Sequence, residues 1–279
     1  PLIGLANVIA TPHVAGSTRE AQEEVGTLIA EQVRDFLAEG ALRNSVNLPS
    51  LSGEQFRRVR PWIELAERLG AFLAQIARGP IEAASFTFAG EPAEMGASVL
   101  RNAALAGMLN HVLAEKVNLV NAAQVAAARG LAIEERTRRR ERGYANRVEI
   151  AVKTAGGAGV AADAALLREA EPWILSVDGI ELEAEMAGTM LFFRNKDVPG
   201  VVGQIGTALG NRGINISTFA LGRRAGHAYR QAGRAERQSA ARGMDAVALV
   251  RLDGDVPENI LETIRALSSV TEARLVRLN

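Results

Sequence analysis

Between residues 189 and 279, short apolar-rich segments are interspersed with two runs whose apolar positions recur at every third and fourth residue. The short segments predict strands, and the helical period predicts helices. The strands are expected at residues 190–194, 214–221, 244–252 and 270–278, and the helices at 200–211 and 257–267. This strand, helix, strand, strand, helix, strand order is that of a ferredoxin-like fold, with one four-stranded antiparallel sheet and both helices on one face.

The middle of the chain predicts a second α+β unit. An amphipathic helix is expected at 61–77, and two alanine-rich helices are expected at 99–113 and 117–129. Alternating segments predict strands at 81–89, 147–154, 160–167, 173–177 and 180–185. A Gly-Gly pair at 156–157 and an Asp-Gly pair at 178–179 predict the turns of two hairpins.

The N-terminal segment predicts one short strand and one helix. Residues 7–11 have the pattern of a buried strand. Ser17 and Glu20 match a capping box, in which each side chain accepts from the other residue's backbone amide, so a helix is expected from there to about residue 38. The stretch 44–49 is interpreted as an extended linker. We therefore predict three parts, at residues 1–49, 50–186 and 187–279.

The composition argues against several classes of function. The chain has 279 residues, 48% of them apolar, and no apolar run approaches the ~20 residues of a membrane-spanning helix. Acidic and basic residues balance at 32 each, so we expect neither a nucleic-acid nor a membrane partner, and the arginine cluster at 136–142 is interpreted as a solvated loop. There is no cysteine, and the three histidines lack metal-ligand spacing, so no metal site is expected.

The start of the chain bears on its location and completeness. It lacks the basic and apolar pattern of a signal peptide, so a cytoplasmic protein is expected. The first residue is Pro1 rather than methionine, and we interpret the chain as a fragment of a longer protein.

One polar loop carries the strongest candidate chemistry. Asn195, Asp197, Pro199 and Gly200 stand between a predicted strand and a predicted helix, and Asn215 begins the next strand. Free amides at a helix N-terminus hold carboxylates, and the Asn and Asp oxygens accept from an ammonium or a hydroxyl. The loop therefore predicts a site for a small amino acid. The alternative is that Asp197 only caps the helix.

Several motifs resemble one enzyme family. D-x-P-G at 197–200 and G-I-N-I at 213–216, within the predicted ferredoxin-like order, resemble an ACT domain. The segment 7–22, which contains T-P-H, resembles the end of the nucleotide-binding domain of the D-3-phosphoglycerate dehydrogenases. The stretch 44–49 resembles the exit from their catalytic core, and 117–130 resembles the intervening (ASB) domain of their long form. The motifs follow the family's order along nearly the whole chain.

The resemblance implies a fold and a function. The fold is a multidomain α+β and α/β chain, with the end of a dinucleotide-binding domain and its crossover helix, an intervening domain and an ACT domain. The family oxidises 3-phosphoglycerate with NAD in L-serine biosynthesis, and its T-P-H histidine, here His13, is implied as the catalytic acid/base. L-serine is implied as an allosteric effector, bound between two ACT domains of a homo-oligomer. Asn195 and Asp197 of one chain would face Asn215 of the other.

Two departures from the family pattern affect these expectations. The sequence lacks the G-x-G-x-x-G fingerprint of a dinucleotide site. Gly203, Gly206 and Gly210 instead fall on a predicted helix, where small residues suit close packing, so the chain alone is expected to be inactive. The Arg- and Ala-rich stretch 225–242 is longer than the family usually has, and two outcomes stay open: it leaves the sheet edge free, or it obstructs ACT pairing.

Two alternative functions stay open at this point. One is a stand-alone, non-catalytic ACT-domain regulatory protein, and the other is a related 2-hydroxy-acid dehydrogenase with a different substrate. The family's intervening domain can also hold anions. Here Trp173, Ile180 and Glu181 surround the turn at 178–179 where basic residues are usual, which argues against an anion site there.

Overall fold

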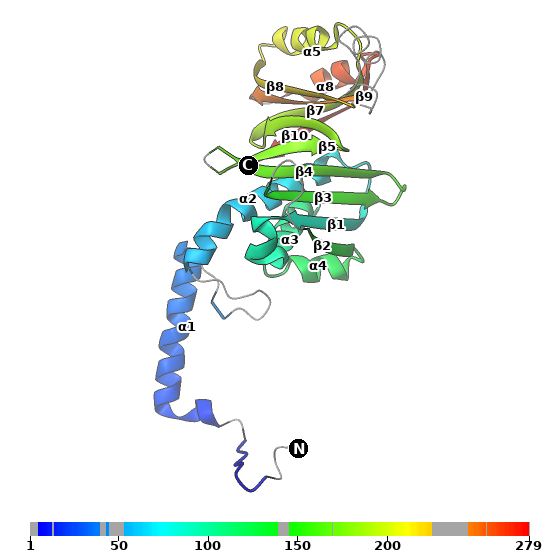
Figure 1. Cartoon of the computed structure of the whole chain (residues 1–279). Helices are drawn as coiled ribbons and strands as arrows, with labels where there is room; N and C mark the ends of the chain where they lie inside the picture. The colour runs from blue at the N-terminus through cyan, green and yellow to red at the C-terminus, as the bar shows by residue number, and fades with distance from the viewer. Residues whose placement is uncertain are drawn as a thin grey trace. The chain divides into compact units, whose positions relative to one another are not determined.

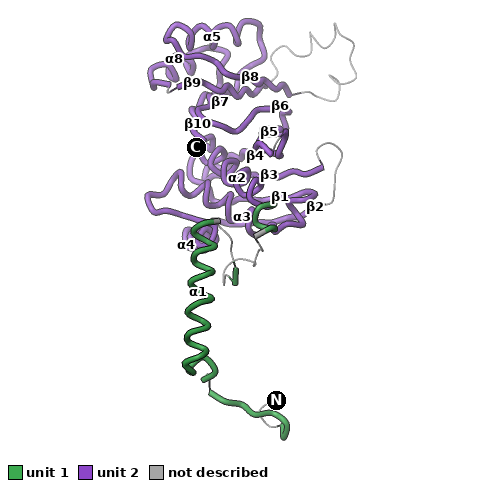
Figure 2. The backbone as a smooth tube through the Cα atoms, turned by 90° about the vertical axis from the view of Figure 1, so that its left-hand side faces the viewer, with its two compact units in different colours: residues 1–58 green, residues 59–279 purple. Residues whose placement is uncertain are grey.

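The structure, a computed structural model shown in Figure 1, describes residues 5–12, 14–39, 43–44, 53–138, 145–168, 170–224, 245–254 and 256–278. The chain divides into two compact units, residues 1–58 and 59–279 (Figure 2). Most of the predicted linker at 44–49 and all of the predicted insert at 225–242 lie outside the described residues.

Unit 1 contains the 3-10 helix η1 (Ala15–Ser17) and the helix α1 (Arg19–Glu39). The predicted helix is confirmed, but its cap is not the predicted one. Ser17 belongs to η1, and the backbone amide of Ala21 donates instead to Thr18 Oγ1 at 3.2 Å. The strand predicted at 7–11 is wrong, because those residues form a turn and irregular backbone.

The next part of the chain combines three helices with a six-stranded sheet (Figure 1). The helices are α2 (Gly53–Ile76), α3 (Glu91–Val112) and α4 (Ala122–Ala128). The strands are β1 (Ile81–Ala89), β2 (Ala132–Arg138), β3 (Arg147–Thr154), β4 (Gly159–Leu167), β5 (Glu171–Val177) and β6 (Ile180–Glu185). Their order is β2-β1-β3-β4-β5-β6, with β1 and β2 parallel and the other neighbours antiparallel. Both predicted hairpins, β3–β4 and β5–β6, are confirmed.

Helix boundaries in this part differ from the predicted ones. α2 begins eight residues before Pro61, the predicted start, and α3 begins before a break at Gly96, whose φ is 128°. The helix predicted at 117–129 is shortened to α4. The Asn118 side chain accepts from the backbone amides of Val120 (2.9 Å) and Asn121 (3.2 Å), which forms a turn where the first helical turn was expected.

Strand β2 was not predicted, because its seven residues show no apolar alternation. It pairs through its backbone with β1, from Ala83↔Ala132 to Ala89↔Arg138, while its side chains are mostly exposed. Arg136 therefore lies on an edge strand and not in the predicted solvated loop. Its guanidinium pairs with Glu134 at 2.6 Å.

Two glycines let α2 and α3 cross at close range. A Cβ at Gly70 would lie 2.0 Å from the carbonyl oxygen of Ala104, and one at Gly107 would lie 2.0 Å from the carbonyl oxygen of Glu67. No side chain larger than hydrogen fits at either crossing point without moving a backbone.

The C-terminal part has the predicted ferredoxin-like order. Its elements are β7 (Gly188–Lys196), α5 (Val201–Gly210), β8 (Asn215–Arg223), β9 (Asp245–Asp253), α8 (Glu258–Arg265) and β10 (Val270–Leu278). The sheet order is β10-β7-β9-β8 with antiparallel neighbours, and α5 and α8 cover one face (Figure 1). Phe193, Ile205, Val250 and Ile264 are fully buried between the helices and this face. The mixed α+β class is confirmed.

The close packing expected at three glycines of α5 is wrong. A Cβ built at Gly203, Gly206 or Gly210 meets nothing within 4 Å in the described chain. The apolar side chains of Val201, Ile205 and Leu209 are the ones that α5 buries, so the glycines fall on other faces of the helix.

The other face of the C-terminal sheet packs against the preceding part of unit 2. The rings of Phe72 on α2 and Phe192 on β7 meet edge to face at 6.1 Å between centroids. A Cβ at Gly222 on β8 would lie 2.3 Å from the carbonyl oxygen of Glu181, so β6 lies directly over this face. Both faces of the C-terminal sheet are thus covered, one by α5 and α8 and the other by α2 and β6.

Candidate functional site

The loop between β7 and α5 leaves the helix N-terminus uncapped by side chains. Lys196 ends β7, and the Val198 amide donates to the Lys196 carbonyl at 2.9 Å. Gly200 precedes the helix with φ 95°, a left-handed conformation that suits glycine, and no side chain caps α5. The interpretation that Asp197 caps this helix is therefore wrong. The first amides of α5 retain the partial positive charge that attracts a carboxylate.

Asn195 lies inside this end of the sheet. Its residue is 3% exposed, and its Nδ2 donates to the Lys196 carbonyl at 2.9 Å. Its Oδ1 has no hydrogen-bond partner among the described residues. An unpaired buried oxygen of this kind costs about 1–3 kcal/mol, so a ligand donor that reaches it would gain affinity.

Asp197 is held by an arginine that the sequence reading did not single out. Its carboxylate lies 3.0 Å from Arg223 Nε at the end of β8, and its side chain is 13% exposed. The pair holds one carboxylate oxygen of Asp197 within the loop. Arg223 is 26 residues from Asp197 in sequence, and only the β7-β9-β8 order brings the two together.

Asn215 lies at the opposite end of the sheet from this loop. Asn195 is the register partner of Ala246 and Asn215 that of Asp253, so the two asparagines are separated by the length of β9, about 23 Å. Asn215 Nδ2 instead donates to Asp253 Oδ2 at 2.6 Å. A single chain thus brings together Asn195 and Asp197 but not Asn215.

Ser269 is a further polar residue at the loop end. The backbone amide of Lys196 donates to its carbonyl at 2.9 Å, and the residue is 9% exposed. Its Oγ is buried and has no partner among the described residues. The sequence does not single out Ser269. It is one of two consecutive serines in the turn between α8 and β10, and the sequence alone does not show which of them is buried.

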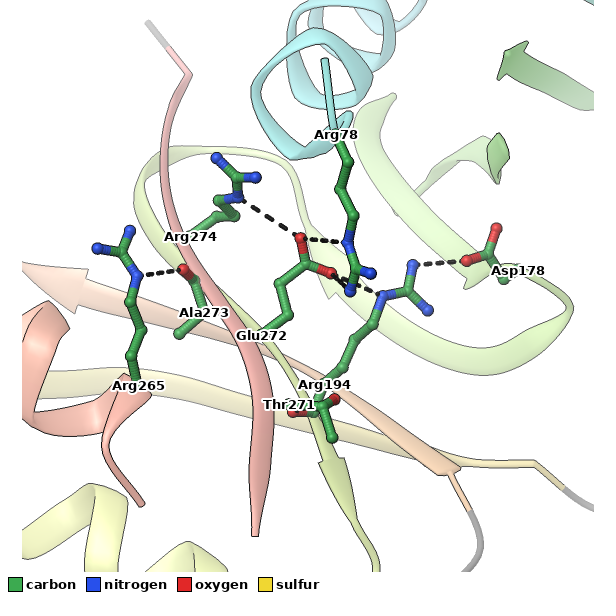
Figure 3. A network of polar contacts seen from close by, with 8 residues as sticks. All are labelled: Arg78, Asp178, Arg194, Arg265, Thr271, Glu272, Ala273 and Arg274. Carbon is green, nitrogen blue, oxygen red and sulfur yellow. Dashed lines mark hydrogen bonds and ion pairs between the residues drawn. The ribbon is translucent and has the colours of Figure 1, made fainter. Parts of the chain in front are cut away.

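A chain of ion pairs lies directly behind the loop, on the other face of β7 (Figure 3). Glu272 of β10 accepts from Arg78 at 3.1 and 2.7 Å and pairs with Arg194 of β7 at 3.2 Å and with Arg274 at 3.5 Å. Arg194 also donates to Asp178 of the β5–β6 turn at 2.5 Å. Arg194 directly precedes Asn195 and pairs with Asp178. One side chain next to the loop therefore contacts the intervening part of the chain.

This network occupies the place where an anion site was considered. A cavity of about 230 Å³ is lined by residues that include Arg78, Asp178, Arg194 and Glu272. Burial alone would raise the pKa of Glu272, but the hydrogen bonds and positive charges of the arginines outweigh it and hold the pKa below its usual value. Two basic side chains, Arg78 and Arg194, therefore stand beside the turn despite its apolar and acidic sequence neighbours, and each pairs with a carboxylate.

The three histidines were the remaining candidates for catalysis or metal binding. His13 and His227 lie outside the described residues, and His111 is exposed near the end of α3. No group of three or more metal-binding side chains occurs within the described ranges. None of the helices that the structure describes has the length and apolar content of a membrane span.

Comparison with known proteins identifies both parts of unit 2. Residues 58–178 match the family model of the D-3-phosphoglycerate dehydrogenase intervening domain, and residues 189–269 match that of the ACT domain. Both matches fall within the parts predicted at 50–186 and 187–279. ACT domains are regulatory domains.

Curated relatives match along the whole chain. The D-3-phosphoglycerate dehydrogenase of Methanocaldococcus jannaschii is 31% identical over 278 residues, which cover 100% of this chain and 49% of that protein. The enzyme of the same name from Synechocystis is 34% identical over 98% of this chain and 46% of its own length. That of Bacillus subtilis is 26% identical over 97% and 48%.

The chain spans about half the length of these relatives. The intervening domain argues for this family over other 2-hydroxy-acid dehydrogenases, as expected. By its two domains and by these relatives, the chain matches the C-terminal regulatory part of the D-3-phosphoglycerate dehydrogenases.

Proposed function

We propose that the ACT domain of this chain binds L-serine and regulates a D-3-phosphoglycerate dehydrogenase. The observation that carries the proposal is the buried Oδ1 of Asn195, which has no partner in the described chain and stands five residues before Gly200, the residue that precedes α5. The helix amides would hold the carboxylate of the amino acid. The oxygens of Asn195 and Asp197 would accept from its ammonium.

The site would be completed by a second copy of the chain. β8 is an edge strand, paired only with β9 among the described strands. Antiparallel pairing of two β8 strands centred on Phe219 would set Asn215 of one copy opposite Arg223 of the other. Because Arg223 holds Asp197, this pairing would bring Asn215 to the loop of the other copy. The two-fold axis would give two equivalent sites.

The catalytic proposal concerns the whole enzyme. The whole enzyme would oxidise 3-phosphoglycerate to 3-phosphohydroxypyruvate with NAD, and His13 would be its catalytic acid/base. The described residues do not fit NAD, since they show no Gly-rich turn between a strand and a helix, so we derive no step through it. α1 would be the crossover helix against the catalytic core. One face of α1 is apolar, and each residue on it is 47–56% exposed. These residues are Val25, Leu28, Ile29, Val33 and Phe36.

Ligand-dependent unfolding tests the regulatory proposal. L-serine at millimolar concentration is expected to raise the unfolding temperature of the 279-residue chain by mass action. Asp197→Ala is expected to abolish the rise. Asp245→Ala is the control, because it removes an ion pair with Lys196 (2.6 Å) at the same end of the sheet without changing the loop. An unchanged temperature for the wild-type chain would refute L-serine binding.

A spectrophotometric assay tests the catalytic proposal. The chain alone is expected to form no NADH from NAD and 3-phosphoglycerate. Turnover by the purified chain would show that the proposed division of activity is wrong.

A further inference from the structure

Two buried polar atoms at the loop end have no partner among the described residues, and only one of them belongs to the predicted site. Asn195 Oδ1 was expected there, whereas Ser269 Oγ was not. The Lys196 amide donates to the Ser269 carbonyl at 2.9 Å, and Asn195 is the register partner of Val270, so both side chains belong to the same end of β7. The C-terminus of α8 and the N-terminus of α5 also reach this end of the sheet.

The neighbouring hydroxyl shows that this turn can satisfy such groups internally. Thr271 Oγ1 donates to the Arg194 carbonyl at 3.2 Å, two residues along from Ser269 (Figure 3). Ser268 is exposed to solvent and needs no protein partner. Ser269 is thus the one of these three that is buried without a partner in the described chain, which costs free energy unless a ligand meets it.

The chemistry of the two atoms differs and assigns them different ligand groups. A carboxamide oxygen only accepts, so Asn195 Oδ1 suits an ammonium. A serine hydroxyl both donates and accepts, so it suits another hydroxyl. We propose that Ser269 is a specificity residue that binds the side-chain hydroxyl of the amino-acid effector. The inference rests on the proposed binding of L-serine and adds the reason for preferring it over L-alanine.

Titration calorimetry with L-serine and L-alanine tests this pairing in the 279-residue chain. The wild-type chain is expected to bind L-serine about tenfold more tightly, the worth of one hydrogen bond between neutral groups. Ser269→Ala is expected to bind both ligands with the wild-type affinity for L-alanine, so the preference disappears. Ser268→Ala is the matched control and is expected to keep the preference. The unfolding temperature of ligand-free Ser269→Ala should not fall, since the substitution removes an unpaired hydroxyl.

Each other result overturns the inference in a distinct way. If Ser269→Ala still prefers L-serine, another residue binds the hydroxyl of the ligand, and the proposed function is unaffected. Equal weakening for both ligands would show a structural role. If the wild-type chain binds L-serine and L-alanine equally, no residue of the site binds the hydroxyl of L-serine. A wild-type chain that binds neither would refute the proposed function and the inference together.

Discussion

The carboxylate of Glu272 accepts from or pairs with three arginines and is 8% exposed as a side chain. Glu272→Gln would leave Arg78 and Arg194 facing a neutral group, and we expect it to lower the free energy of unfolding by about 2 kcal/mol. The control is Glu258→Gln, whose exposed pair with Arg265 should contribute at most about 0.5 kcal/mol. Urea unfolding followed by tryptophan fluorescence measures both, and equal effects would contradict the assigned role of Glu272.

The same residue predicts a pH dependence. The arginines hold the folded-state pKa of Glu272 below its ordinary value of 4.5. Its stabilising contribution is therefore complete above pH 4.5 and is lost as the pH falls through the lowered folded-state pKa. The stability difference between wild type and Glu272→Gln should shrink in that acidic window. If the stability difference between wild type and Glu272→Gln stays constant from about pH 7 to about pH 3, the arginine pairing of Glu272 is contradicted.

At the scale of residues, the sequence identified only part of the candidate site. Asn195 and Asp197 could be predicted, because a polar loop before a Pro-Gly helix start is a local pattern. Arg223 and Ser269 could not, because each reaches the loop only through the sheet register or through the α8–β10 turn. Asn215 was assigned to a second chain, and its place at the far end of the sheet agrees with that assignment without testing it.

At the scale of elements, the crossing of α2 and α3 depends on glycine. We expect Gly107→Ala to lower the free energy of unfolding by about 3 kcal/mol, because its Cβ would meet a backbone oxygen that no rotamer change can move. Gly206→Ala is the matched control. Nothing lies within 4 Å of its Cβ, so the better helix propensity of alanine should stabilise by about 0.5–1 kcal/mol. Thermal unfolding of both variants measures the contrast, and destabilisation by Gly206→Ala alone would refute this account of the crossing.

Elements with a buried face were predicted well, and exposed or turn-rich ones were not. The central strands of the ACT domain, β7 and β9, are apolar in continuous runs because one face packs Phe193 and Val250 against the helices and the other face packs against α2. The exposed edge strand β2 carries no such pattern. The predicted helix at 117–129 was shortened by Asn118, whose local hydrogen bonds compete with the helix in a way that apolar spacing does not reveal.

At the scale of the whole molecule, the effector site is proposed to need two chains, and a mixing experiment distinguishes this from a site within one chain. Asp197→Ala and Asn215→Ala should each abolish L-serine binding. In a mixed dimer, one site would carry both substitutions, and the other would join an intact Asp197 to an intact Asn215. After dissociation and random reassociation of equal amounts, two-fold symmetry gives about one quarter of the wild-type sites. Calorimetry counts the sites. If each site lies within one chain, mixing restores none, because every chain then carries its own defect.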